Sequence, residues 1–336
     1  MVTIHDVAAH AGVSAMTVSR VLNGSQKVAP ATRQRIEKAI EELGYFPNAL
    51  ARGLLSGRTQ TIGVLVGDIT NPYWTAVASG AEEVVHRNGY TMVLGNTGSS
   101  QDKADQLIQT LVSNRVDGLL INDSPRKTLK TLIKRDYPIV LINKEYPGIH
   151  ADTITGDNFY GASVLTQHLL DLGHTRIALL NGPIDDSEAI ERERGFRKTL
   201  QDAGVEANGA WILNASYHRH SGYQPAKMLL TLPPDDRPTA IVASNNFIAL
   251  SVIEAARDVE VRIPEELALV GFDDFELAST IYPFLTVIAQ PARVYGMQAA
   301  QMLIDHLNSP GHWQISRRVF TPELIVRISC GSKLRR

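Results

Sequence analysis

The sequence predicts an N-terminal all-α helix-turn-helix headpiece, followed by an α/β core of two doubly wound parallel-sheet subdomains. Roughly the first 45 residues hold three short amphipathic helical segments and no apolar strand. From Thr61 onward, apolar runs alternate with amphipathic helical stretches, which is the pattern of a parallel sheet covered on both faces. The alternation restarts after Gly156, which indicates a second, similar subdomain.

The composition is that of an ordinary soluble protein with real cores: 336 residues, of which 44% are hydrophobic and 20% charged. Its one cysteine, Cys330, excludes an internal disulfide and a cysteine metal cluster, so a cytoplasmic location is expected. Polar residues interrupt the N-terminus, so no signal peptide is expected. No apolar run approaches the roughly 20 residues that cross a bilayer, so no membrane partner is expected either.

The net charge of −2 is unevenly distributed. Residues 1–60 carry a net charge of +3, which leaves −5 on the remainder of the chain. A basic head on a mildly acidic body is typical of a nucleic-acid binder with an attached sensor. A chance fluctuation of a few charges is the alternative.

The chain begins with two short helices joined by a tight turn. Thr3 and Asp6 form a capping pair for the first helix, and Gly12 permits the turn. Ser14 caps the second helix, whose inner face carries Val18, Val21 and Leu22. Its outer face carries short or hydrogen-bonding side chains and one arginine: Ala15, Met16, Thr17, Ser19, Arg20 and Asn23. Such a face suits a helix in the DNA major groove, although an ordinary helical hairpin is equally compatible with the pattern.

A third helix runs from Pro30 to Gly44, and a weaker helical segment follows it. Asn48 can cap that segment and Gly57 can end it, but Gly53 makes a helix of about two turns marginal by itself. The alternative is a plain linker.

The core strands are predicted from continuous apolar runs, at 62–66, 91–94, 118–121, 139–142, 177–180, 211–213, 240–243, 267–270, 317–320 and 324–328. Amphipathic helices are predicted between them, at 73–88, 103–114, 129–135, 159–172, 188–203, 222–230, 247–257 and 294–307.

Ligands of open α/β sheets lie beyond the carboxyl ends of the strands. The side chains expected there are Tyr73, Trp74, Asn122, Asn143, Lys144, Arg192, Tyr217, Asn245 and Asp273. Aromatic faces combined with amides, a carboxylate and an arginine are suited to a polyol. Each residue also has a plainer interpretation, since an Asn after a strand is often a helix cap and Arg192 can pair within its own helix.

The segment Asp-Val-Ala-x-x-Ala-Gly-Val-Ser-x-x-Thr-Val-Ser-Arg-Val-Leu-Asn-Gly, which begins at Asp6, closely resembles the lactose-repressor (LacI/GalR) family of bacterial transcription regulators. The resemblance extends over about residues 2–330. It implies a homodimeric repressor that binds a palindromic double-stranded DNA operator. It also implies that 47–60 contains a hinge helix that folds on specific DNA, with Leu54 wedged between base pairs of the minor groove.

Under this hypothesis Arg20 contacts guanine, and Ala15 and Met16 make apolar contacts to neighbouring bases. The remaining residues of the expected DNA-binding set are Ser14, Thr17, Ser19, Asn23, Thr32, Tyr45, Asn48, Ala51 and Leu54.

The resemblance implies a periplasmic-binding-protein-like clamshell for the core. The expected divisions are a headpiece at 1–46, a hinge helix and linker at 47–60, an effector-binding and dimerisation core at 61–330 and a tail at 331–336. Within the core, 61–157 and 291–320 form one subdomain, and 158–289 and 321–330 form the other. Arg192, Tyr73, Trp74, Asp273, Asn245, Tyr217 and Gln290 match effector-pocket positions of the family.

The chain departs from the family at two places in this expected pocket. The family commonly has an acid where this chain has Asn246, and another near Asn143 and Lys144. If Lys144 faces the cleft together with Arg192, the pocket has surplus positive charge, and a sugar acid or sugar phosphate becomes a candidate effector. The alternative is that Lys144 pairs with Glu145 or solvent and that the effector is a neutral sugar.

Two other function classes compete with a ligand-controlled repressor. A cytoplasmic solute-binding protein fits the clamshell alone, but the basic headpiece argues against it. An α/β enzyme acting on sugars is disfavoured, because no Gly-x-Gly-x-x-Gly motif, nucleophile elbow or metal-ligand spacing of histidines is present. We therefore expect no catalytic residues, no metal and no cofactor.

Overall fold

The structure is a computed structural model that describes residues 2–22, 25, 27–45, 58–309, 311 and 313–332, except for the side chains of 276–278. The chain divides into two compact units, Met1–Thr59 and Gln60–Arg336. The first is the headpiece and the second is the core.

The described part of the headpiece is built from three helices: α1 (Ile4–Ala11), α2 (Ala15–Leu22) and α3 (Pro30–Leu43). Their apolar faces meet in a single core that includes Val7, Val18 and Ile36, all fully buried. α3 begins at a proline, whose missing N–H costs nothing in the first turn. It ends at Gly44, whose φ of 58° is a left-handed cap. The predicted three-helix headpiece is confirmed.

The core contains two six-stranded sheets. The strands of the first sheet are, in spatial order, β11 (Arg317–Phe320), β5 (Asp152–Gly156), β4 (Ile139–Ile142), β3 (Gly118–Ile121), β1 (Thr61–Val66) and β2 (Thr91–Asn96). All neighbouring strands of this sheet pair in parallel.

The second sheet repeats this order with different segments. Its strands are β12 (Glu323–Ile325), β10 (Thr286–Ala289), β9 (Ala268–Phe272), β8 (Ala240–Ala243), β6 (Ile177–Asn181) and β7 (Ile212–Asn214). The edge strand β12 runs antiparallel to β10, and the other pairs are parallel.

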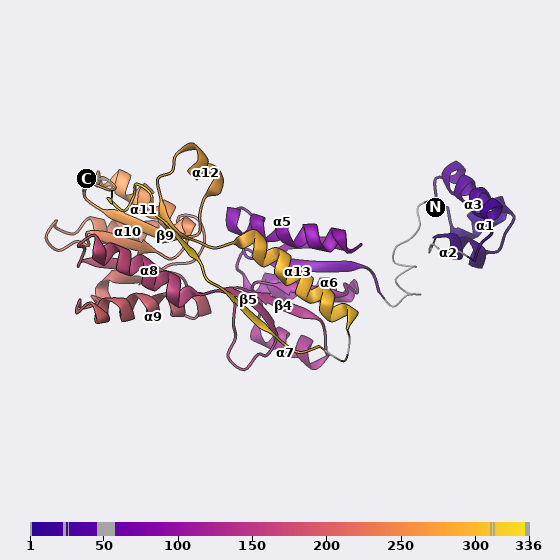
Figure 1. Cartoon of the computed structure of the whole chain (residues 1–336), viewed down its shortest axis with the longest axis horizontal. Helices are drawn as coiled ribbons and strands as arrows, with labels where there is room; N and C mark the ends of the chain where they lie inside the picture. Colours follow the sequence, from indigo (N-terminus) through magenta and orange to yellow (C-terminus); the bar gives the residue numbers. More distant parts are fainter. Residues whose placement is uncertain are drawn as a thin grey trace. The chain divides into compact units, whose positions relative to one another are not determined.

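Helices cover both faces of each sheet. On the first sheet, α5 (Pro72–Arg87) and α13 (Ala292–Asn308) share one apolar core with it, while α6 (Gln101–Ser113) and α7 (Arg126–Lys134) share another on the opposite face (Figure 1). On the second sheet, the helices are α8 (Asn158–Asp171) and α9 (Ser187–Asp202) on one face, with α10 (Tyr223–Leu230) and α11 (Asn246–Asp258) on the other. This is the predicted doubly wound architecture.

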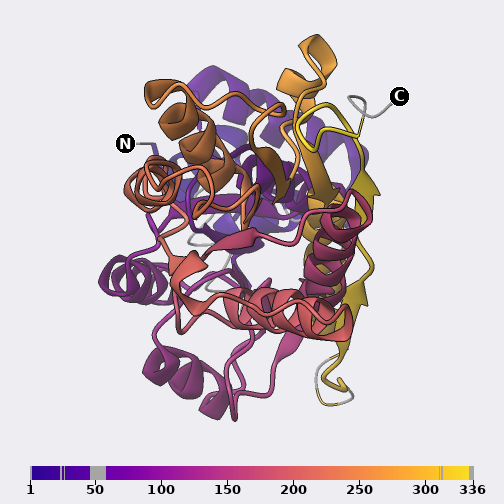
Figure 2. The ribbon, with the colours of Figure 1, turned by 90° about the vertical axis from the view of Figure 1, so that its left-hand side faces the viewer.

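The chain passes between the two sheets three times, after β5, after β10 and after β11. The C-terminal segment, drawn in yellow, therefore runs along both sheets and supplies an edge strand to each (Figures 1 and 2).

Sequence patterns missed two strands, β5 and β10, and the short helix α12 (Glu276–Ile281). The predicted strand at 324–328 is wrong in extent, because β12 ends at Ile325. In the described parts of the chain, no helix combines the length and apolar character that a membrane span requires.

Candidate functional site

The turn between α1 and α2 is built as its residues predict. Thr3 and Asp6 form a reciprocal capping box, in which the Thr3 backbone N–H donates to Asp6 Oδ2 at 2.8 Å. Gly12 adopts the left-handed conformation with φ of 65°. The Ser14 hydroxyl accepts the Thr17 backbone N–H at 3.2 Å and so caps α2. These contacts fix the angle at which α2 leaves the turn.

The outer face of α2 is available to a partner. Met16 is 64% exposed although it is a large apolar residue, and Arg20 is also exposed. Thr17 and Ser19 are half-buried beside them. An exposed methionine next to an exposed arginine offers both apolar and bidentate contacts to base edges.

Other residues of the expected DNA-binding set are less exposed or not described. Ala15 and Tyr45 are half-buried and pack against the headpiece core, so Ala15 does not lie wholly on the outer face as predicted. Thr32 is half-buried in the first turn of α3. Four expected residues lie outside the described residues: Asn23, Asn48, Ala51 and Leu54.

In the core, a cavity of about 340 Å³ lies where the carboxyl ends of the two sheets face each other. Loops after strands of both sheets line it, together with the N-termini of α5, α9 and α11. Nine of the residues expected there are among its lining: Tyr73, Trp74, Asn122, Asn143, Lys144, Arg192, Tyr217, Asn245 and Asp273.

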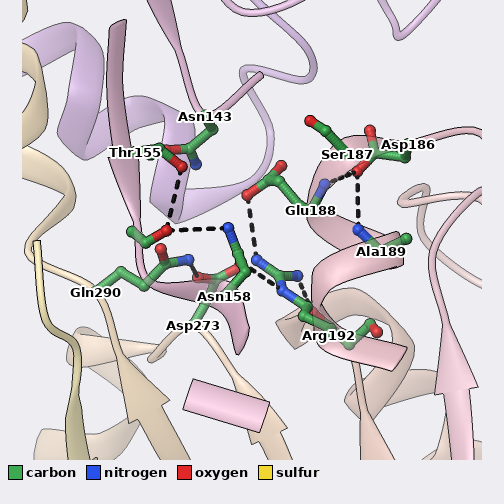
Figure 3. Close-up of polar contacts among 12 residues, drawn as sticks. Asn143, Thr155, Asn158, Asp186, Ser187, Glu188, Ala189, Arg192, Asp273 and Gln290 are labelled. Carbon is green, nitrogen blue, oxygen red and sulfur yellow. Dashed lines mark hydrogen bonds and ion pairs between the residues drawn. The ribbon is translucent and has the colours of Figure 1, made fainter. Parts of the chain in front are cut away.

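Arg192 forms the most contacts of these residues. Its Nε donates to Asn158 Oδ1 at 2.8 Å, and its terminal nitrogens donate to the Ser244 carbonyl and, at 3.2 Å, to Glu188 Oε1. Its guanidinium also lies over the ring of Phe272, 4.1 Å from the centroid. Figure 3 shows the guanidinium between Glu188 and Asn158. Arg192 therefore does both things that the sequence analysis treated as alternatives: it pairs with Glu188 within its own helix, and it lines the cavity.

The contacts of Lys144 contradict the expectation that the cavity carries surplus positive charge. It lines the cavity, but its Nζ lies 2.9 Å from Asp186 Oδ2 and 3.4 Å from Asp123 Oδ1. Burial disfavours the charged ammonium, but the attraction of Asp186 and Asp123 outweighs it and raises the pKa of Lys144. Since both partners are carboxylates, the charge of Lys144 is compensated by the protein. The anionic effector that depended on this surplus therefore loses its support.

Three polar links join loops of the two sheets across the cavity. Lys144 follows β4 of the first sheet, whereas Asp186 caps α9 of the second. Asn71 and Asn246 exchange two amide hydrogen bonds, each 2.9 Å long, while buried at 4% and 0% exposure. The third link is between the Glu145 backbone N–H and Ser187 Oγ, at 3.1 Å. Polar links of this kind can be exchanged for ligand contacts without exposing an apolar core.

Gln290 is not part of the lining, although the family resemblance implies an effector contact. Its Nε2 donates to Asp273 Oδ1 at 2.7 Å, so it orients a carboxylate that does line the cavity. Glu188 and the Asn71–Asn246 pair were missed as site residues. The i,i+4 spacing of Glu188 and Arg192 was the available signal for the first, whereas no local pattern links Asn71 to Asn246.

Burial raises the pKa values of two carboxyl groups in the cavity. It raises the pKa of Glu188 to about 8, against the attraction of Arg192. It also raises the pKa of Asp273, against Arg192 and the hydrogen bond from Gln290. Among the described residues, no cluster of three or more His, Cys, Asp or Glu is arranged to hold a metal ion.

Comparison with known protein families gives two matches. Residues 3–48 match the model of bacterial regulatory proteins of the lacI family, and residues 166–330 match a periplasmic binding protein-like domain. The chain is 37% identical over 332 residues to the HTH-type transcriptional repressor PurR of Vibrio vulnificus, covering 97% of this chain and 98% of the relative. It is 36% identical to the PurR of Photobacterium profundum, with 98% of each chain covered.

Solved structures give the same picture. The lac repressor dimer bound to operator and the anti-inducer ONPF matches with a TM-score of 0.85 and 26% identity, over 98% of this chain and 99% of that one. The transcriptional regulator CelR in complex with cellobiose matches with a TM-score of 0.72 and 31% identity, over 98% and 100%.

Proposed function

Because the chain belongs to the lacI family of bacterial regulatory proteins, it is a DNA-binding transcriptional repressor with a small-molecule effector, and we propose that its effector is a sugar-like polyol. The observation that carries this proposal is the polar cavity between the two sheets, lined by Tyr73, Trp74 and Tyr217 as well as by amides and carboxylates. A polyol can stack its ring on such aromatic faces while its hydroxyls meet the polar groups.

The cavity's position supplies a mechanism of control. Its lining comes from both sheets, and two links join the subdomains there: Lys144 to Asp186, both in the lining, and the lining residue Asn71 to the buried Asn246. A ligand that replaces or strengthens these links changes the relative preference for two arrangements of the subdomains. It can shift DNA affinity only as far as its affinities for those two arrangements differ.

We assign the DNA contacts to the headpiece, residues 1–46, and to the hinge segment 47–60. Arg20 reads a guanine and Met16 adds an apolar base contact, while Thr17, Ser19 and Thr32 contact phosphates. The exposure of Met16 and Arg20 on α2 supports these roles. The core at 61–330 binds the effector.

We further propose that the repressor acts as a homodimer in the cytoplasm, on a palindromic operator. In the described core, the large apolar side chains of Val93, Met228, Ile281 and Tyr282 are exposed at 41%, 54%, 88% and 62%. Exposed side chains of this size are suited to a subunit interface. Two-fold symmetry of the protein would then be mirrored in the operator.

The proposed function is tested on the full chain. Random double-stranded DNA is selected by binding to the purified repressor, and we expect an inverted repeat of two half-sites. Light scattering of the complex should give two chains per operator. Addition of the effector should change the apparent DNA affinity severalfold, and selection of a single unrepeated half-site would contradict the dimer.

The variant Arg20→Ala should weaken operator binding without affecting the stability of the headpiece. We expect a loss of ~1–3 kcal/mol in binding, roughly 5- to 150-fold, and relaxed preference at one base position of each half-site. The measurement is a binding titration with a library of operator variants. Arg257→Ala, which removes an exposed arginine from the core, is the control and should bind as the parent does. An unchanged sequence preference in Arg20→Ala would assign base recognition elsewhere.

A further inference from the structure

The candidate effector cavity is rich in carboxyl groups. Among its described lining residues are seven Asp or Glu side chains but only two Lys or Arg side chains, Lys144 and Arg192. Both cations are already engaged: Lys144 contacts Asp123 and Asp186, and Arg192 contacts Glu188. Carboxyl groups therefore outnumber cationic side chains among the described lining residues.

Asp273 is a buried acid of the cavity whose side chain receives its hydrogen bond from an uncharged donor. It is 7% exposed, and Gln290 supplies an uncharged N–H donor to its Oδ1. Among the described residues, no Lys, Arg or His nitrogen lies within the 4.0 Å of its carboxyl oxygens that would make an ion pair. Burial raises the pKa of Asp273, and the attraction of Arg192 together with the hydrogen bond from Gln290 only partly offsets this effect.

The side-chain oxygen of Asn143 independently indicates that the cavity lacks a hydrogen-bond donor. Its side chain is 3% exposed and its Nδ2 donates to the Tyr73 hydroxyl, but the buried Oδ1 has no hydrogen-bond partner. Asn143 lines the same cavity as Glu188 and Asp273. A buried amide oxygen without a partner costs free energy unless a ligand or water donates to it.

We propose that the effector carries a protonated amino group, which binds among Glu188, Asp273 and the amide oxygen of Asn143. An ammonium group has three N–H donors and no acceptor, so it can donate to the unpartnered Asn143 oxygen and to the carboxyl groups of Glu188 and Asp273, each of which accepts one hydrogen bond from the protein. Its positive charge also favours the ionised forms of the two buried carboxyl groups. A neutral hydroxyl satisfies one acceptor and leaves the charge uncompensated, whereas a carboxylate or phosphate adds repulsion. This inference rests on the proposed function and narrows its sugar-like effector to an amino sugar or a similar amino polyol.

The test uses sets of sugars that differ only in charge. For the gluco, galacto and manno stereochemistries, binding of the amino sugar, the neutral parent and the uronic acid is measured by calorimetry with the full-length protein. In at least one set, the amino sugar should bind about tenfold or more tightly than the neutral parent, with the uronic acid weakest. If no amino sugar binds more tightly than its neutral parent in any of the three sets, the proposal is overturned.

Two isosteric variants locate the ammonium site. Glu188→Gln keeps an oxygen that accepts from Arg192, and Asp273→Asn suits the left-handed backbone at that position, where φ is 65°. Each should reduce the preference for the amino sugar to below about threefold. The control is Glu191→Gln on the same helix, whose exposed carboxylate pairs with Arg194 and should leave the preference unchanged. Equal preference in the parent and both variants would contradict the assigned position.

The same experiments separate this inference from the proposed function. If in every set the neutral sugar binds at least as tightly as its amino sugar, and a neutral sugar changes operator affinity, the ammonium site is overturned and the polyol-controlled repressor is left intact. Failure of the full chain to select any operator would overturn the operator model whatever the sugars do.

Discussion

Replacing Arg192 by alanine is expected to lower the free energy of unfolding of the core by about 3–5 kcal/mol and to abolish effector binding. The guanidinium is fully surrounded by partners from both strands and helices of the second sheet: Glu188, Asn158, Ser244 and the ring of Phe272. Its removal leaves the Glu188 carboxyl buried without its cation, and leaves two carbonyl-type oxygens without donors. Removing one partner of a buried ion pair destabilises the fold by more free energy than the intact pair contributed, because the other charge stays buried without a partner.

The loss should be measured by urea unfolding of the full chain, followed by ligand titration of the folded fraction. Arg194→Ala is the matched control, because Arg194 lies one half-turn along α9 and its side chain is 64% exposed in an ion pair with Glu191. We expect a change below about 1 kcal/mol for that variant. A similar loss in the two variants would show that the charge of α9, and not the buried contacts of Arg192, sets the stability.

Replacing Gly296 by alanine is expected to cost about 3 kcal/mol or more in the free energy of unfolding. Gly296 lies in α13 where this helix packs against α5, and an added Cβ would lie 1.9 Å from the Val77 carbonyl oxygen and 2.8 Å from the Ala81 backbone nitrogen. A Cβ added at Gly80 of α5 would likewise lie 2.0 Å from the Arg293 carbonyl oxygen. Because the obstacles are backbone atoms, the two helices must move apart before an alanine fits.

Thermal unfolding of Gly296→Ala should therefore show a large decrease in Tm, and its recombinant yield should fall. Gly209→Ala is the control, since nothing lies within 4 Å of its Cβ position and its φ is not in the left-handed region. This control should be neutral or slightly stabilising, because alanine restricts the unfolded chain more than glycine does. If Gly296→Ala unfolds at the parent's temperature, the close approach of α5 and α13 is not needed for stability.

The local parts of the fold could be predicted from the sequence. The Thr3–Asp6 capping box, the turn at Gly12 and the Ser14 cap depend on contacts between residues at most three or four apart. The alternation of apolar runs with amphipathic helices likewise reports burial on both faces of a sheet, segment by segment. These signals are local, so they can be interpreted without knowing which residues are neighbours in space.

The missed strand β5 lacks such signals. β5, Asp152–Gly156, is polar in sequence and yet wholly buried. Its Asp152 is accommodated because Trp313 and Ser316 donate to the carboxylate from more than 160 residues away along the chain. A sequence pattern treats Asp152 as a surface residue, since its partners are remote.

The sequence by itself determined the family, the two-part organisation and nine residues of the cavity lining, because these depend on motifs and on the positions that follow strands. Only the tertiary structure decided the charge of the cavity. Lys144 is a cation in the sequence, but the second sheet brings Asp186 to 2.9 Å and the first brings Asp123 to 3.4 Å. Electrostatic free energy depends on distance and burial, and neither is encoded locally when the partners follow strands of different sheets.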